Sequence, residues 1–215
     1  MNKKIALISS TGASVVKTVY SRTAREHFNI DLVIVDRECG AKKFAEENNI
    51  DLVMMNWSNR DAGSKKILDI LIEKNIDYVY LFFTRLLSGR LLEKYANKII
   101  NFHPSILPAC PGLHGFEDTI NSGAMLAGST VHFVDPGMDT GKIIQQAYAP
   151  IYGSKNLRHL IFAQQCASLF CIHQKIIKSI DLRNFDNENF DISQGFLPNI
   201  DAASFSLFEK ILNQQ

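Results

Sequence analysis

Two polar side chains, Asn101 and His103, stand one residue apart at the end of a short apolar run. Side chains alternate along a strand, so the amide and the imidazole would share one face while Phe102 points into the core. An amide donor beside an imidazole can stabilise a negative oxygen that develops during a reaction. The alternative is that both residues are simply polar side chains at the end of a strand, where the chain turns. The proline-rich loop 104–115 favours the functional interpretation because it predicts a rigid wall behind the pair.

Two further segments have residue types that could bind a ligand. Ser9–Ser14 follows the first apolar run, and its small residues around Gly12 would let backbone N–H groups face an anion at a helix N-terminus. It has neither a Walker pattern nor GxGxxG, so a plain tight turn explains it equally well. Asp135–Gly141 carries two aspartates and two glycines. It fits a turn between strands or a loop that lies against a flat ligand.

The first hundred residues contain the elements that would position these segments. Short apolar runs, typical of strands buried on both faces, alternate with longer amphipathic stretches. The expected strands are Ile5–Ile8, Leu32–Val35, Leu52–Met55, Tyr78–Phe83 and Ile99–Phe102. The expected helices are Ala13–Arg25, Ala41–Asn48, Gly63–Asn75 and Gly89–Asn97. This alternation predicts an α/β fold, a doubly wound, mostly parallel, Rossmann-like sheet with helices on both faces. Ligands of such sheets bind beyond the carboxyl ends of the strands.

The second half of the chain changes its pattern. A short helix, two strands and a long helix are expected at Phe116–Ser122, Ser129–Val134, Lys142–Ile151 and Asn156–Ile180. The tail from Asp181 has no clear pattern, and His27, His159 and His173 are expected at helix surfaces or caps. With no repeat or linker, we expect one domain over 1–215. Its parts would be βα units at 1–100, a catalytic and ligand-binding part at 101–180, and a divergent tail at 181–215.

Composition excludes several classes of protein. Hydrophobic residues are 46% and charged residues 21%, as in ordinary globular chains. Lys+Arg 23 against Asp+Glu 22 leaves a net charge of +1, so no nucleic-acid partner is expected. The four cysteines form no metal-binding or CxxC spacing, so we expect reduced thiols and no metal. No apolar run reaches roughly 18 residues and no secretory signal is evident, so no membrane partner and a cytoplasmic location are expected.

Five segments together resemble the folate-dependent formyltransferases, in that family's order and spacing. They are Arg85–Leu87, Asn101–Pro108, Pro111–His114, Gly128–Asp135 and Met138–Gly141. The resemblance is strongest from Leu81 to Ile151 and poor after Asn156. It implies the formyltransferase fold, catalytic roles for Asn101, His103 and Asp139, and a cis bond at Leu107-Pro108. It also implies that the pterin of the folate is held by Arg85, Leu86, Leu87, Val134, Asp135, Pro136, Gly137 and Met138. His114 and His132, in matched segments, could line the site.

The resemblance also implies a reaction. A formyl group would pass from the co-substrate 10-formyltetrahydrofolate to a primary amine, first of all phosphoribosylglycinamide in purine biosynthesis. Asn101 and a protonated His103 would donate to the developing oxyanion, and Asp139 would favour that protonated form and relay a proton. Neither a metal nor a covalent nucleophile is needed. The partners expected are a small-molecule amine and, at most, a second copy of the chain, as a monomer or homodimer.

The side that would bind the amine departs from the family. Substrate-binding roles fall on Thr11, Gly12, Ala13, Ser14, Pro104 and Gln165. The family's Gly-x-Gly-Ser-Asn is here Ser10–Ser14, its acidic residue on the long helix is Cys166, and its Asn-bearing loop is Asp36-Arg37-Glu38. An amino sugar carried on a nucleotide is therefore an alternative acceptor, and a non-catalytic folate-binding relative is an alternative of another class. Hydrolases and tRNA-formylating enzymes of the family usually carry a further domain, and tRNA binding would also require a basic face.

Overall fold

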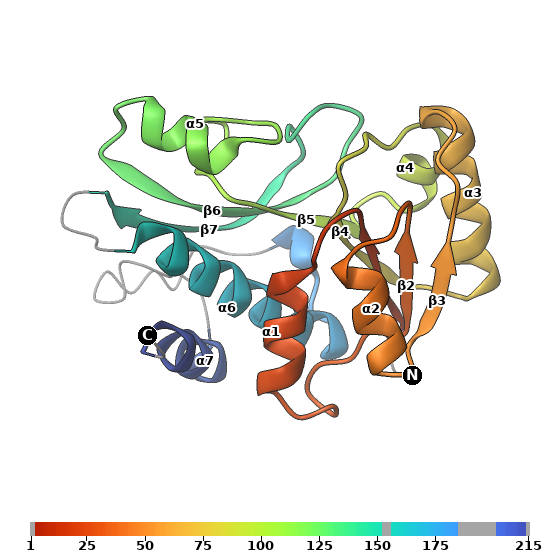
Figure 1. Cartoon of the computed structure of the whole chain (residues 1–215), viewed down its shortest axis with the longest axis horizontal. Coiled ribbons are helices and arrows are strands. Elements are labelled where there is room, and N and C mark those ends of the chain that lie inside the picture. Colours follow the sequence, from red (N-terminus) through yellow and green to blue (C-terminus); the bar gives the residue numbers. More distant parts are fainter. Residues whose placement is uncertain (1–2, 152–155, 185–200, 214–215) are drawn as a thin grey trace.

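A seven-stranded sheet forms the centre of the computed structural model, which describes residues 3–151, 156–184 and 201–213. The strand order is β3-β2-β1-β4-β5-β6-β7 (Figure 1). The strands are β1 (Ile5–Ser9), β2 (Leu32–Val35), β3 (Asp51–Met54), β4 (Tyr78–Phe82), β5 (Ile99–His103), β6 (Leu126–Phe133) and β7 (Ile143–Pro150). The first five pair in parallel, whereas β6 runs antiparallel to both β5 and β7. The predicted mostly parallel, doubly wound sheet is confirmed.

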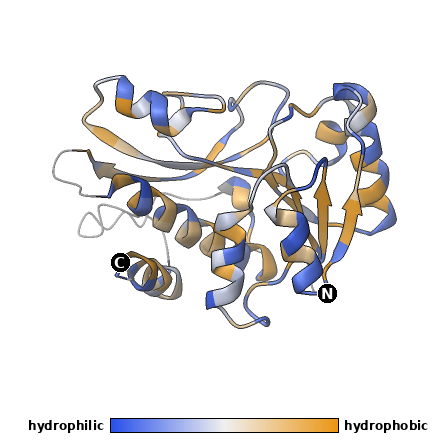
Figure 2. Cartoon of the chain, in the orientation of Figure 1, coloured by the Kyte–Doolittle hydropathy of each residue, from blue (hydrophilic) through white to orange (hydrophobic). Residues whose placement is uncertain are grey.

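Helices cover both faces of this sheet. They are α1 (Ser14–Arg22), α2 (Gly40–Glu47), α3 (Arg60–Glu73), α4 (Arg90–Lys94), α5 (Gly115–Asn121), α6 (Leu157–Ile177) and α7 (Ala202–Leu212), with a 3-10 turn at Leu182–Asn184. One core cluster joins the sheet to α1, α2, α6 and α7, and a second joins it to α3 and α4. Figure 2 shows β2 and β3 as largely hydrophobic, and α1, α2 and α3 with hydrophilic sides. No helix in the described part of the chain is long and apolar enough to cross a membrane.

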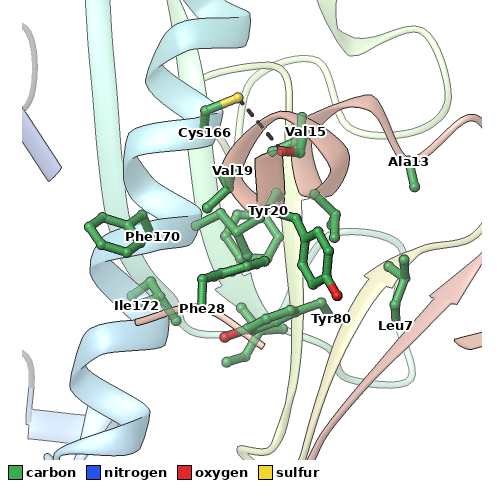
Figure 3. Close-up of a cluster of buried hydrophobic side chains, with 14 of the residues drawn as sticks. Leu7, Ala13, Val15, Val19, Tyr20, Phe28, Tyr80, Cys166, Phe170 and Ile172 are labelled. Atoms are coloured by element: carbon green, nitrogen blue, oxygen red, sulfur yellow. Dashed lines mark hydrogen bonds between the residues drawn. The ribbon is translucent and has the colours of Figure 1, made fainter. Parts of the chain in front are cut away.

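Alternation along the central strands assigns their side chains to the two clusters. In β1, Ile5 and Leu7 belong to the cluster under α1 and α6, whereas Ala6 and Ile8 belong to the one under α3. All four are fully buried, so apolar residues on both faces explain the continuous apolar run in the sequence. Figure 3 shows the first cluster packed between α1 and α6. This packing fixes the strand ends from which the polar segments emerge.

The strand β6 and the helix α7 differ from the sequence prediction. β6 begins at Leu126, three residues before the predicted start, because Gly128 pairs with Tyr148 of β7. A Cβ on Gly128 would overlap the Ala147 carbonyl oxygen, so this strand requires a glycine, which strand propensity disfavours. α7 was not predicted, yet it packs on α6 and buries three residues in the first cluster: Leu207, Phe208 and Ile211.

The expected surface position of His173 is wrong. α6 is covered by α1, α7 and the sheet, and His173 is fully buried in it. The Asn29 backbone N–H donates to its Nε2 at 3.4 Å, so Nδ1 carries the hydrogen that it shares with the Tyr80 hydroxyl at 3.0 Å. Burial lowers the pKa of His173 from 6.5 to about 3, so the ring is neutral in the folded protein.

Acidification is expected to destabilise the fold through His173. Below pH 6.5 the unfolded chain binds a proton at this ring, whereas the folded chain resists protonation until about pH 3, so stability falls as pH drops through this window. The loss reaches about 3 kcal/mol at pH 4. Urea unfolding at pH 7, 5.5 and 4 measures it. His173→Asn, which keeps a partner for Tyr80 but cannot titrate, should lose less stability over the same range. An identical loss in both proteins would contradict this role.

Candidate active site

The carboxylate of Asp139 is the centre of a polar cluster at the carboxyl end of β5. Asn101 and His103 extend from β5 to the same side, and His132 on β6 pairs in register with Asn101. Asp139, in the loop between β6 and β7, lies 3.3 Å from Asn101 Nδ2, 3.4 Å from His103 Nδ1 and 3.5 Å from His132 Nε2. The Gly112 backbone N–H donates to its Oδ2 at 2.7 Å. The structure therefore brings the three predicted catalytic residues together.

Backbone carbonyls determine how the two imidazoles face this carboxylate. His103 Nε2 lies 2.9 Å from the Cys110 carbonyl oxygen, which only accepts, so Nε2 carries a hydrogen and Nδ1 faces Asp139. A contact between Nδ1 and a carboxylate is attractive when the ring is an imidazolium. His132 Nδ1 likewise donates to the Phe133 carbonyl at 2.9 Å. Its Nε2 lies 3.1 Å from Asn101 Nδ2 and 3.5 Å from the Asp139 carboxylate.

The environment of Asp139 keeps its carboxyl group ionised. Burial alone raises its pKa, but the hydrogen bonds from His132 and the Gly112 N–H, and the charges of His103 and His132, outweigh burial and lower the pKa. The side chain is only 14% exposed. Its backbone adopts φ +57°, a left-handed conformation that aspartate tolerates better than most residues. A buried, ionised carboxylate next to an imidazole can accept a proton or hold the imidazolium form.

A pocket opens next to this cluster. Its lining includes Asn101, Asp139 and six of the eight residues predicted to hold the pterin: Arg85, Leu86, Leu87, Val134, Asp135 and Gly137. His132 also lines it, whereas His114, Pro136 and Met138 are not among its lining residues, and Met138 is instead 51% exposed beside Gly112. The sequence prediction missed Leu81 and Phe83, which also line the pocket. Their apolar strand positions indicated burial rather than a site. The bond Leu107-Pro108 is cis, as expected.

The predicted amine-binding segment forms a tight loop after β1. The Thr11 N–H donates to Ser9 Oγ at 3.1 Å, and the Ala41 N–H donates to the Thr11 carbonyl at 3.2 Å. Gly12 approaches Gly40 so closely that a Cβ on Gly40 would overlap it. Ala13 has φ +50° and begins α1 without a side-chain cap. The loop thus joins the starts of α1 and α2, and it presents backbone rather than charged groups.

The other departures on this side lie in different environments. Gln165 donates to the Phe102 carbonyl at 3.0 Å, and Pro104 is half-buried directly after His103. Cys166 is fully buried against the Val15 carbonyl (Figure 3), and burial raises the pKa of its thiol. It therefore belongs to the core rather than to the site.

Asp36, after β2, connects the loop to the pocket. Its carboxylate accepts from Arg37 at 2.8 Å and from Arg85 Nε at 3.3 Å. Burial raises the pKa of Asp36, but hydrogen bonds from Arg37, Ser10 and Arg85 overcome this and lower it to about 2. The ionised Asp36 therefore ties Ser10, on the amine side, to Arg85, which lines the pocket. In the described part of the chain, no group of three or more His, Cys, Asp or Glu residues is suited to a metal ion.

Comparisons with known proteins agree with this arrangement. Residues 3–163 match the family described as formyl transferase. Phosphoribosylglycinamide formyltransferase of Bacillus subtilis is 33% identical over 151 residues, which cover 67% of this chain and 77% of that protein. The protein of the same name from Mycobacterium tuberculosis is 32% identical, over 68% of this chain and 70% of its own. A trifunctional purine biosynthetic protein of Drosophila melanogaster is 32% identical, but the match spans only 12% of its length.

A solved structure of a protein with the same name is also similar to this chain. The crystal structure of phosphoribosylglycinamide formyltransferase from Bacillus halodurans has a TM-score of 0.74 and 28% identity, over 88% of this chain and all of that one. The sheet, the cluster around Asp139 and the family match over three quarters of the sequence converge on one conclusion. This chain belongs to the formyl transferase family.

Proposed function

We propose that this chain transfers the formyl group of 10-formyltetrahydrofolate to the amine of phosphoribosylglycinamide, a step of purine biosynthesis. The observation that carries the proposal is the position of the Asp139 cluster at the edge of a pocket lined by Leu87, Val134 and Gly137. The names of the relatives support the same acceptor. A pterin is flat and carries polar edges, so a pocket that combines apolar side chains such as Leu87 and Val134 with the polar Arg85 and Asp135 suits it.

Each residue of the cluster has its own role in the transfer. The amine attacks the formyl carbon, a new C–N bond forms, and the bond from that carbon to the folate nitrogen breaks. Asn101 Nδ2 and the His103 imidazolium supply hydrogens to the oxygen, which becomes negative. Asp139 accepts the proton that the attacking amine loses, and His103 returns a proton to the departing nitrogen. No proton is gained or lost overall.

The distances around Asp139 are compatible with these roles. Contacts of 3.3 to 3.5 Å to Asn101, His103 and His132 exceed the 2.7–2.9 Å typical of charge-assisted hydrogen bonds. The donors therefore lie near the carboxylate but bond it only weakly, so a substrate oxygen can compete for them. Catalytic hydrogen bonds commonly shorten when substrate binds.

The acceptor is inferred from the loop after β1 and from α6. The loop Thr11–Ser14 offers backbone N–H groups at the start of α1, where a phosphate group is favoured by the helix dipole. Ala13 and Ser14 replace the side chains that the family usually supplies, and Cys166 is buried in the core. An amine other than phosphoribosylglycinamide, such as an amino sugar linked to a nucleotide, is therefore the second candidate.

Purified protein incubated with 10-formyltetrahydrofolate and one acceptor at a time tests the proposal. We expect tetrahydrofolate to appear, followed by absorbance, when phosphoribosylglycinamide is present, and not when the amine is omitted. Release without any amine would indicate hydrolysis instead. Release only with a nucleotide-linked amino sugar would keep the reaction and change the acceptor. No release with either amine or with water would contradict the proposal.

A further inference from the structure

Asp36 is a buried carboxylate whose hydrogen-bonding capacity is used within the protein. Its side chain, directly after β2, is only 1% exposed. Oδ1 accepts from Arg37 Nε at 3.0 Å, and Oδ2 accepts from a terminal nitrogen of Arg37 at 2.8 Å and from Arg85 Nε at 3.3 Å. The Ser10 hydroxyl is a further donor. A carboxylate has about four lone-pair sites, so these donors leave no capacity at Asp36 for a substrate.

The donors to Asp36 come from the ends of three neighbouring strands. β2, β1 and β4 lie side by side and run parallel, so their carboxyl ends meet at one edge of the sheet (Figure 1). Arg37 follows β2, Ser10 follows β1, and Arg85 follows β4. Ser10 begins the segment predicted to bind the amine, whereas Arg85 lines the pocket. One carboxylate therefore contacts parts of both predicted binding regions.

Backbone pairing does not hold the side chains that meet at Asp36. The Ser10 N–H donates to the Phe82 carbonyl at 3.1 Å, so the backbones after β1 and β4 meet without Asp36. Among the residues that the structure describes, however, Asp36 is the only hydrogen-bond partner of the Arg85 side chain. That side chain is 44% exposed, so without the carboxylate it would adopt other rotamers. The Ser10 hydroxyl would lose an acceptor by the same change.

Stability alone does not account for a charged side chain at this position. Removing a carboxylate from water is costly, and apolar residues of similar volume often give a fold that is equally stable or more stable. What an apolar residue cannot provide is direction. A guanidinium bonded through its planar fork has a defined orientation, so the carboxylate of Asp36 determines where Arg37 and Arg85 point.

From this arrangement we infer that Asp36 is a positioning residue for both substrates, which holds Ser10 on the amine side and Arg85 on the donor side in one fixed geometry. The inference rests on the proposed function, since that function assigns the folate to the pocket and the amine to the loop after β1. Asp36 itself touches neither the substrates nor the reacting atoms. Its replacement should therefore weaken binding of both substrates and leave the chemistry at Asp139 intact.

Asp36→Asn tests the role, with Asp31→Asn as the matched control. Asparagine has the same shape as aspartate, but it has no charge and only one acceptor oxygen. Asp31 lies directly before β2 and Asp36 directly after it, so the two variants change opposite ends of one strand. Asp31 also accepts two hydrogen bonds, from the Ile5 N–H at 2.8 Å and from Asn29 Nδ2 at 3.0 Å. The control therefore removes a hydrogen-bonded carboxylate at the end of the strand that is far from the site.

Binding of the donor can be measured apart from turnover. Trp57 is the only tryptophan in the sequence, and the centre of its ring lies 5.1 Å from that of Phe83, which lines the pocket. Quenching of its fluorescence by tetrahydrofolate therefore gives a Kd. For Asp36→Asn we expect this Kd and the KM for the amine each to rise about tenfold, as loss of charge-assisted hydrogen bonds implies. The kcat should fall by less than about threefold, and Asp31→Asn should leave both constants within about twofold of wild type.

Double variants separate positioning from a general loss of structure. In otherwise wild-type protein, Arg85→Met should raise the Kd for tetrahydrofolate about tenfold. In protein that already carries Asp36→Asn, the same change should raise it by less than about twofold, because Arg85 is no longer held toward the pocket. Ser10→Ala should show the same dependence on Asp36 in the KM for the amine.

The possible failures are distinguishable. A wild-type protein whose fluorescence does not respond to tetrahydrofolate, and which transfers no formyl group, would overturn the proposed function together with this role. If the wild type binds and transfers, unchanged constants in Asp36→Asn would overturn only the role of Asp36. A rise in one constant alone would overturn the claim that Asp36 serves both substrates. Additive effects in the double variants, or equal losses of binding in Asp31→Asn, would make Asp36 a folding residue rather than a positioning one.

Discussion

Replacing His103 with glutamine is expected to lower kcat for formyl transfer by roughly 10³-fold, within the range set by general acid–base and oxyanion contributions. The imidazole is 4% exposed, its Nε2 is held by the Cys110 carbonyl, and its Nδ1 faces Asp139. Glutamine can replace one of these hydrogen bonds, but it carries no positive charge and cannot return a proton to the leaving nitrogen. The loss should therefore fall on kcat rather than on binding.

Steady-state rates at saturating donor and amine measure this loss. The control is His27→Gln, because His27 is exposed on the surface far from β5 in the sequence and should keep wild-type kcat. The Kd for tetrahydrofolate can be measured from the fluorescence of Trp57, whose ring lies 5.1 Å from the pocket-lining Phe83. It should change by less than about threefold, since His103 is not among the pocket-lining residues. A His103→Gln protein that keeps more than a tenth of the wild-type kcat would contradict the assigned role.

Asp139→Asn should cause a loss of similar size, again roughly 10³-fold in kcat. The amide keeps a carbonyl oxygen that can accept the Gly112 N–H, so the loop 104–115 retains its anchor. It removes the negative charge that faces His103 Nδ1 at 3.4 Å, and it removes the acceptor for the proton of the amine. Because the fold is preserved, Tm should move by no more than about 4 °C.

The pH dependence adds a second test of Asp139. Its pKa lies below the ordinary 3.8, so the carboxylate stays ionised throughout the range in which the protein can be assayed. The titration of Asp139 should therefore cause no change in the wild-type rate above pH 5. Asp51→Asn, a change at an exposed ion pair with Lys74, is the control and should keep full activity. A wild-type rate in Asp139→Asn would show that another group takes the proton.

Much of the fold follows from hydrophobic periodicity in the first hundred residues. β2 coincides with its predicted range, and β1 is one residue longer than predicted. Both were found because central parallel strands are apolar on both faces and end abruptly at polar residues. The start of α3 was placed three residues late, because Asn59 caps it through its side chain and Arg60–Ala62 show no apolar face. α7 was missed although its apolar residues repeat at helical spacing, since the polar stretch before it carries no pattern.

The site could be predicted only where chemistry is visible in the residue types. Asn101 and His103 are separated by one strand residue, which places them on one side. Asp139 was assigned only through the resemblance to the family, since its loop alone also fits an ordinary turn. The contacts of Arg60 and Asp36 could not be predicted in this way. Arg60 bonds backbone carbonyls 27 and 76 residues away, and no side-chain pattern reveals such contacts. The side chain of Asp36 is 1% exposed because it lies after β2 and contacts Ser10, after β1, and Arg85, after β4.

The most direct test follows the formyl carbon itself. Wild-type protein and His103→Gln are each mixed, in excess, with 10-formyltetrahydrofolate labelled with carbon-13 in the formyl group and with phosphoribosylglycinamide, and the products of a single turnover are weighed by mass spectrometry. We predict that the label enters the amine product with wild-type protein and does so roughly 10³-fold more slowly with the variant. Label recovered as formate, or equal rates in the two proteins, would contradict the claim that the cluster around Asp139 catalyses formyl transfer to an amine.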